Sequence, residues 1–121
     1  MSDATHGHPA AGGLPTGTVT FVFTDVVGST ALWEQAPNAM GPAMARHDAL
    51  VEATVAEYGG IVVKPRGEGD SQFIVFARAS AAAAAAIAVM HALQRERWVT
   101  PSPIRVRMAI HSGEAEVRAG D

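Results

Sequence analysis

Residues 18–30 have the sequence Thr-Val-Thr-Phe-Val-Phe-Thr-Asp-Val-Val-Gly-Ser-Thr, and this stretch decides the fold. Its apolar residues Val19, Phe21 and Phe23 alternate with threonines, which is the period of a half-buried strand. The strand ends at Asp25, and the Gly-Ser-Thr that closes the stretch supplies backbone freedom and hydroxyls that cap helices. We therefore expect a strand, a sharp turn and then a helix.

A long helix and a hairpin are predicted after this turn. From about Asn38 to Tyr58 the larger side chains recur at the spacing of one helix face; they are Met40, Met44, His47, Val51, Val55 and Tyr58. Glycines at 59 and 60 end this helix. Strands at Ile61–Val63 and Gln72–Phe76 flank the turn-rich residues 65–71, and we expect them to pair as a β-hairpin.

A second helix and a fourth strand complete the pattern. The alanine-rich segment from Ala79 to about Arg97 predicts a helix, and the residues expected on its apolar stripe are Ala83, Ile87, Met90 and Leu93. After two prolines, apolar residues at every second position predict a strand with one buried face; they are Ile104, Val106, Met108 and Ile110.

The order β-α-β-β-α-β predicts an α+β fold of the ferredoxin-like type, an antiparallel sheet with both helices on one face. Such a fold leaves the other sheet face uncovered. Arg105, Arg107 and His111 fall on the non-core side of the fourth strand. A partner domain and a solvated surface both remain possible explanations for these three residues.

Composition limits the class of protein. The 121 residues carry a net charge of −3 and a pI near 5.9, so no nucleic acid partner is expected. The absence of cysteine excludes disulfides and thiolate metal sites and favours a cytoplasmic location. Residues 1–16 are predicted to be a disordered leader, residues 17–121 one domain, and no segment has the composition of a membrane span.

Two aspartates occupy comparable places in this fold. Asp25 ends the first strand and Asp70 lies in the hairpin between the second and third strands. The first strand of such a sheet lies against the third, so the two carboxylates can converge, and carboxylate oxygens suit Mg²⁺. The backbone amides of residues 27–30 can hold a phosphate at the start of a helical turn. From the residues alone, a nucleoside triphosphate site and two ordinary turn aspartates both remain open.

Three motifs resemble those of the class III adenylate and guanylate cyclases. They are Val19–Thr30, the hairpin Gly67–Phe73, and His111–Glu114 followed by Val117–Asp121. They occur in the family's order between Gly17 and the end of the chain. The chain therefore resembles the N-terminal part of a nucleotidyl cyclase catalytic domain, about three-fifths of it by comparison with the family.

The resemblance implies the following site. Asp25 and Asp70, assisted by the carbonyl of Val26, would bind two Mg²⁺ or Mn²⁺ ions, and the amides of Val27, Gly28, Ser29 and Thr30 would contact the triphosphate. The ribose 3′-hydroxyl would attack the α-phosphate, giving a cyclic nucleotide and pyrophosphate. Family sites form between two domains packed head to tail, so a homodimer or a complementing cyclase half is expected.

Two departures from the family pattern qualify this expectation. Arg66 stands where adenylate cyclases carry a base-recognising lysine; it offers only donors, which suits N1 of adenine, so ATP is favoured over GTP. A solvated turn arginine is the other interpretation. The family's transition-state Asn and Arg and its second base-selecting residue lie beyond the matched segment. Because losing such donors costs a hundredfold or more in rate, we expect the chain alone to be inactive or weakly active.

The sequence also leaves room for other functions. A non-catalytic cyclase-like module for regulation or dimerisation is the second candidate function. A diguanylate cyclase fits poorly, because residues 67–71 do not match the Gly-Gly-Asp/Glu-Glu-Phe signature that the hairpin of those enzymes carries. His47 interrupts an apolar stripe, and a hydrogen-bonded, semi-buried histidine is favoured there over a general base.

Overall fold

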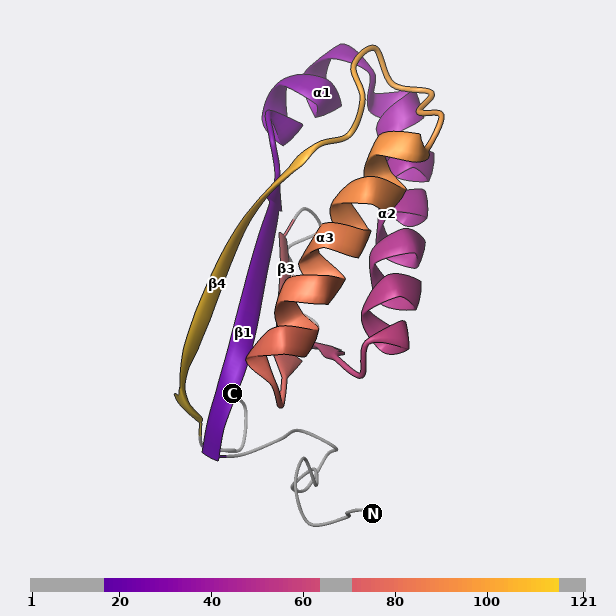
Figure 1. Ribbon diagram of the computed structural model, residues 1–121. Helices are drawn as coiled ribbons and strands as arrows, with labels where there is room; N and C mark the ends of the chain where they lie inside the picture. Colours follow the sequence, from indigo (N-terminus) through magenta and orange to yellow (C-terminus); the bar gives the residue numbers. More distant parts are fainter. Residues whose placement is uncertain (1–16, 64–70, 116–121) are drawn as a thin grey trace.

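The computed structural model describes residues 17–63 and 71–115 (Figure 1). The leader predicted for residues 1–16, Arg66 and Asp70 of the hairpin, and the motif at 117–121 lie outside the described residues. In chain order the elements are β1 (Gly17–Val26), α1 (Ser29–Gln35), α2 (Pro37–Glu57), β2 (Ile61–Val63), β3 (Ser71–Phe76), α3 (Ala79–Arg95) and β4 (Val106–Ala115).

The four described strands form one antiparallel sheet in the order β2-β3-β1-β4. β1 is central: its whole length pairs with β4, and its second half pairs with β3. Helices α2 and α3 run side by side against one face of this sheet, and α1 lies at one end (Figure 1). The α+β fold with helices on one face, predicted from the order of elements, is confirmed.

An additional helix follows β1. We expected the Gly-Ser-Thr turn to lead through a hydroxyl cap into the long helix; instead it starts the seven-residue α1, which has no side-chain cap hydrogen bond. Gly28 precedes this helix in the left-handed conformation, at φ 65°. The residue before a proline is disfavoured in helical geometry, and Ala36 before Pro37 accordingly separates α1 from α2.

The buried face of β1 differs from the expected one. Val22, Val26 and the threonines at 20 and 24 are buried under the helices, whereas the side chain of Phe23 is 49% exposed. The ring of Phe21 instead stacks on Phe73 of β3 with centroids 5.2 Å apart, and the ring of Phe23 contacts Phe73 at a tilt with centroids 4.7 Å apart. Alternation gives the period of a strand but not which of its faces the helices cover.

The apolar stripe of α3 was also assigned wrongly. The buried residues are Ala82, Ala85, Val89 and Leu93, of which only Leu93 was predicted. Ala83, Ile87 and Met90 are exposed. Because nearly every position of this helix is apolar, the sequence pattern cannot single out one face; the small Ala82 and Ala85 allow close approach to the sheet.

Helix α2 packs largely as predicted, with Met40, Met44, His47, Val51 and Val55 all buried. Tyr58, also expected on this face, lies just past the helix and is 37% exposed. Its end is fixed by two glycines. Gly59 has φ 78°, and the amide of Gly60 donates to the carbonyl of Val55 at 3.0 Å. A Cβ atom placed on Gly60 would lie 2.5 Å from a ring carbon of Phe76. The chain can therefore pass from α2 into β2 only where position 60 has no side chain.

We predict that Gly60→Ala lowers the free energy of unfolding by about 1–3 kcal/mol, because the added methyl displaces the Phe76 ring. Gly41→Ala is the matched control, since Gly41 lies within α2 with open space around it and should be neutral or stabilising by up to about 1 kcal/mol. Urea unfolding followed by far-UV circular dichroism measures both. Equal midpoints for the two variants would contradict the close approach.

Candidate functional site

The candidate site is a depression of about 430 Å³ on the sheet face that the helices leave open. It lies where β1, β3 and β4 meet near the end of β1, and its walls include Phe23, Phe73, Ala109, Asp25, Ser71 and Arg107. The aromatic and aliphatic side chains form its floor on one side, and the polar group Asp25, Ser71 and Arg107 forms the other. A hydrophobic base next to charged groups is typical of a small-ligand site.

Asp25 lies at the polar end of this depression. Its partners in the sheet register are Ser71 on β3 and Arg107 on β4. The Nη2 of Arg107 donates to Oδ2 of Asp25 at 2.5 Å, although the two side chains are 71% and 46% exposed. The sequence placed Arg107 on the non-core side of β4 but gave no sign of this pairing, which depends on the register between β1 and β4.

Asp70 directly precedes Ser71 in the sequence, and Ser71 lies opposite Asp25. Asp70 and Arg66 themselves lie outside the described residues, so the expected convergence of the two aspartates stays a prediction. The oxygen donors present, a carboxylate with a hydroxyl across the ladder, are of the kind that Mg²⁺ and Mn²⁺ prefer. Within residues 17–63 and 71–115, no group of three acidic or histidine side chains forms a metal site.

The turn after β1 supplies fewer free amides than expected. The amide of Val27 donates to the carbonyl of Arg105 at 2.8 Å, so it is not available to a phosphate. The first helical bond of α1 runs from the amide of Leu32 to the carbonyl of Gly28. Amides ahead of that bond have no partner within the helix, which leaves those of Gly28, Ser29 and Thr30 as candidates.

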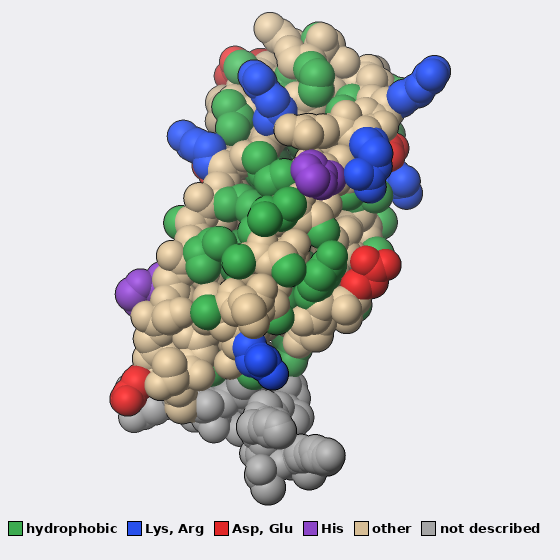
Figure 2. Space-filling model, in the orientation of Figure 1, with side chains coloured by type: hydrophobic (Ala, Val, Ile, Leu, Met, Phe, Trp, Pro, Cys, Tyr) green, Lys and Arg blue, Asp and Glu red, His purple; other side chains and the backbone are tan. Residues whose placement is uncertain are grey.

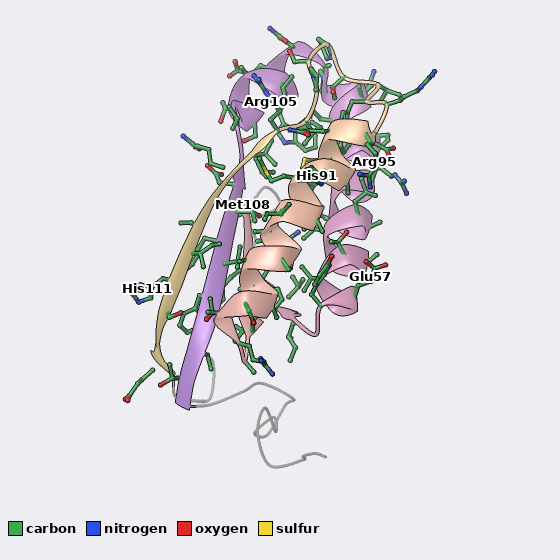
Figure 3. All side chains as sticks on the ribbon, in the orientation of Figure 1. Glu57, His91, Arg95, Arg105, Met108 and His111 are labelled. Carbon is green, nitrogen blue, oxygen red and sulfur yellow. The ribbon has the colours of Figure 1, made fainter. Side chains whose placement is uncertain are left out.

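A second depression, of about 410 Å³, lies on the other side of this turn. It is lined mainly by Val27, Met90, Leu93, Ile104 and Val106, with Arg105 at its edge. Figure 2 shows hydrophobic side chains gathered over the middle of the face that carries α3, and Figure 3 places Arg105 beside α1. His111, by contrast, projects away from the helices (Figure 3). Arg105 and His111 thus lie apart from the Asp25 depression.

The sequence matches the family model of the adenylate and guanylate cyclase catalytic domain over residues 14–119. This chain belongs to that family. It is 42% identical over 104 residues to an uncharacterized protein of Mycobacterium tuberculosis. The aligned region covers 86% of this chain and 34% of the relative. It therefore spans about a third of the length of that relative.

Adenylate cyclases with assigned names are more distant relatives. The adenylate cyclase of Podospora anserina is 34% identical over 119 residues, covering 83% of this chain and 6% of that protein. Among solved structures, an adenylate cyclase from Trypanosoma brucei in its monomeric state superposes with a TM-score of 0.77 at 28% identity. That match covers 90% of this chain and 62% of the other.

In the described part of the chain, no helix is long and apolar enough to cross a bilayer.

We predict that Gly28→Ala lowers the free energy of unfolding by about 1 kcal/mol although open space surrounds the site, because φ 65° strains any residue with a Cβ. Gly28→Asn should recover most of this loss, since asparagine tolerates the left-handed region. Thermal unfolding of the three proteins measures the effect. Equal stability of the alanine variant and the natural chain would show that the turn adopts another conformation.

Proposed function

We propose that this chain supplies the metal- and triphosphate-binding part of a nucleotidyl cyclase site. The reaction is formation of a cyclic nucleotide and pyrophosphate from a nucleoside triphosphate. The observation that carries the proposal is the position of Asp25: family membership comes with a partly exposed carboxylate near the end of β1, directly opposite Ser71, the residue that follows Asp70.

In this proposal Asp25 and Asp70, with the carbonyl of Val26, hold two Mg²⁺ or Mn²⁺ ions. When bound, two such ions activate the ribose 3′-hydroxyl and stabilise the charge on the triphosphate. Asp25 must then release Arg107, whose guanidinium stays beside the depression. A freed guanidinium in that place is suited to a phosphate oxygen.

The remaining contacts follow from the turn and the hairpin. Gly28 sets the left-handed turn that presents the amides of Ser29 and Thr30 to the phosphates, while Val27 contributes through its backbone bond to Arg105, which anchors the turn on β4. Arg66 faces the purine in this proposal. Its donor-only guanidinium favours ATP, with adenine N1 as acceptor, over GTP, so cyclic AMP is the proposed main product.

A second copy of the chain, or a complementing cyclase half, is the proposed partner. Phe21, Phe23 and Phe73 form an aromatic cluster on the open sheet face, next to the Asp25 depression. Exposed aromatic clusters of this kind are enriched at protein interfaces. A site that forms between two chains would also bring a second set of residues to a depression that is open on one side.

The second candidate function is a non-catalytic cyclase-like module that regulates or dimerises a neighbouring domain. The ion pair between Asp25 and Arg107 favours it to the extent that the carboxylate already has a cationic partner. This candidate differs from the first in one property: it needs no divalent metal at Asp25.

Mn²⁺–ATP binding separates these candidates. We predict that the chain binds Mn²⁺–ATP in isothermal titration and that Asp25→Ala/Asp70→Ala weakens binding by about tenfold or more, because charged ligands are lost. Glu34→Ala is the matched control, since Glu34 is an exposed acid on α1. Equal affinity of the natural chain and the double variant would refute the metal site.

Formation of cyclic AMP and cyclic GMP, with Mn²⁺ and high protein concentration, is measured on the same proteins. Product that disappears in the double variant supports cyclase chemistry. Mn²⁺–ATP binding without product supports a cyclase chain whose missing groups come from a partner, whereas absence of both binding and product supports the regulatory module.

We further predict that Phe23→Ser weakens self-association, because it removes an exposed ring from the proposed interface. Sedimentation velocity over a concentration series measures the monomer fraction. Ile87→Ser is the matched control: Ile87 is 59% exposed on α3, on the opposite side of the sheet. If both variants and the natural chain sediment alike, the aromatic cluster is not the interface.

A further inference from the structure

A group of polar side chains is buried between α2 and the sheet, where an apolar core is expected. We refer to Thr24, His47, Asp48 and Gln72 as the α2–sheet polar cluster. His47 is fully buried, Thr24 is 3% exposed and Gln72 is 6% exposed, while Asp48 lies at the boundary with its side chain 41% exposed. His47 is thus more deeply buried than the semi-buried position expected for it.

One carboxylate oxygen, Oδ1 of Asp48, connects the side chains of the cluster. Nε2 of Gln72 donates to Oδ1 of Asp48 at 3.0 Å, and Nδ1 of His47 lies 2.9 Å from the same oxygen. An ionised carboxylate only accepts hydrogen bonds, so Nδ1 of His47 carries the hydrogen in this arrangement. Asp48 therefore ties two buried side chains together, one from its own helix and one from β3.

The cluster is not the arrangement that stability alone would favour. Among the described residues, Oγ1 of Thr24, Nε2 of His47 and Oε1 of Gln72 are buried without a hydrogen-bond partner. Each such atom costs about 1–3 kcal/mol, and apolar side chains of similar shape avoid that cost. Stability therefore does not explain the polar residues at these positions. Their location next to the candidate site does.

That location is the end of the β1–β3 ladder beside the candidate site. Gln72 pairs with Thr24, and the next pair along is Ser71 with Asp25. On its other edge β3 pairs with β2 only from Phe73 onward within the described residues. Within the described residues, Ser71 and Gln72 pair with β1 alone, and the hydrogen bond that Gln72 donates to Asp48 ties this end of β3 to helix α2.

We propose that Asp48 is a positioning residue for the metal site, acting through Gln72 and oriented by His47. The tether fixes the first two residues of β3 against β1, and so holds Ser71 opposite Asp25. The tether itself is independent of the proposed function; its role in metal binding rests on that function.

The tether is tested by amide hydrogen exchange of the natural chain, residue by residue, using NMR. Gln72→Met and Asp48→Leu remove the bond with little change in size. We expect exchange at Ser71, Gln72 and Asp25 to accelerate about ten- to hundredfold, the loss of one hydrogen bond to a charged group. Exchange at the far end of the ladder, at Phe76, should change less than about twofold.

Two further variants sharpen the test. Asp48→Asn keeps an acceptor oxygen for both bonds and should restore exchange close to the natural chain. Thr20→Val is the matched control: Thr20 is a buried threonine of β1 bonded to Ser112 at 2.8 Å, but it pairs with Phe76, four positions from Thr24. Its effect should stay at that end of the ladder.

Mn²⁺–ATP affinity is the second readout. Gln72→Met should weaken binding about tenfold, with Asp48→Asn and Thr20→Val close to the natural chain. Uniformly faster exchange along the ladder in Gln72→Met, or local exchange unchanged, overturns the tether. If exchange becomes faster only at Ser71, Gln72 and Asp25 but the Mn²⁺–ATP affinity is unaltered, the tether exists but has no role at the metal site. A natural chain that does not bind Mn²⁺–ATP refutes the proposed function and, with it, that role, while the exchange data still decide the tether.

Discussion

The structure depends on the pairing of β1 with a strand on each side. Its ten residues pair along their whole length with β4, and Thr20 to Asp25 also pair with β3, so β1 joins β4 to the rest of the described sheet. The helices lie against the face that this strand presents through Val22 and Val26. The same register brings Asp25, Ser71 and Arg107 together from positions far apart in the sequence. Core and candidate site are thus two faces of one ladder.

Much of this arrangement could be predicted because it depends on local patterns. The strand at the start, the glycine end of α2, the short β2 and the position of β3 each follow from periodicity or from turn residues. The face of β1 and the stripe of α3 could not be predicted, since both depend on which surface another element covers. Phe23 is a core residue by type, yet the helices cover the opposite face of β1, and its ring contacts Phe73 on the open face.

The candidate site shows the same division. Asp25 could be identified from its place after the first strand and from the motif around it. Its ion pair with Arg107 could not, because 82 residues separate the two and only the strand register unites them. The sequence also could not predict which backbone amides are free. Val27 belongs to the motif, yet its amide donates a hydrogen bond to the carbonyl of Arg105. Motifs identify residues, whereas hydrogen-bond partners come from the assembled fold.

The long β1–β4 ladder also has a mechanical consequence. Gly17 pairs with Ala115 at one end, and Val26 pairs with Val106 at the other, about 30 Å away at the rise of a strand. A ladder with hydrogen bonds on both strands resists stretching and behaves as a stiff lever. Gly17 and Ala115 at one end and Asp25 near the other therefore belong to a single hydrogen-bonded unit, although about 30 Å of strand separates the two ends.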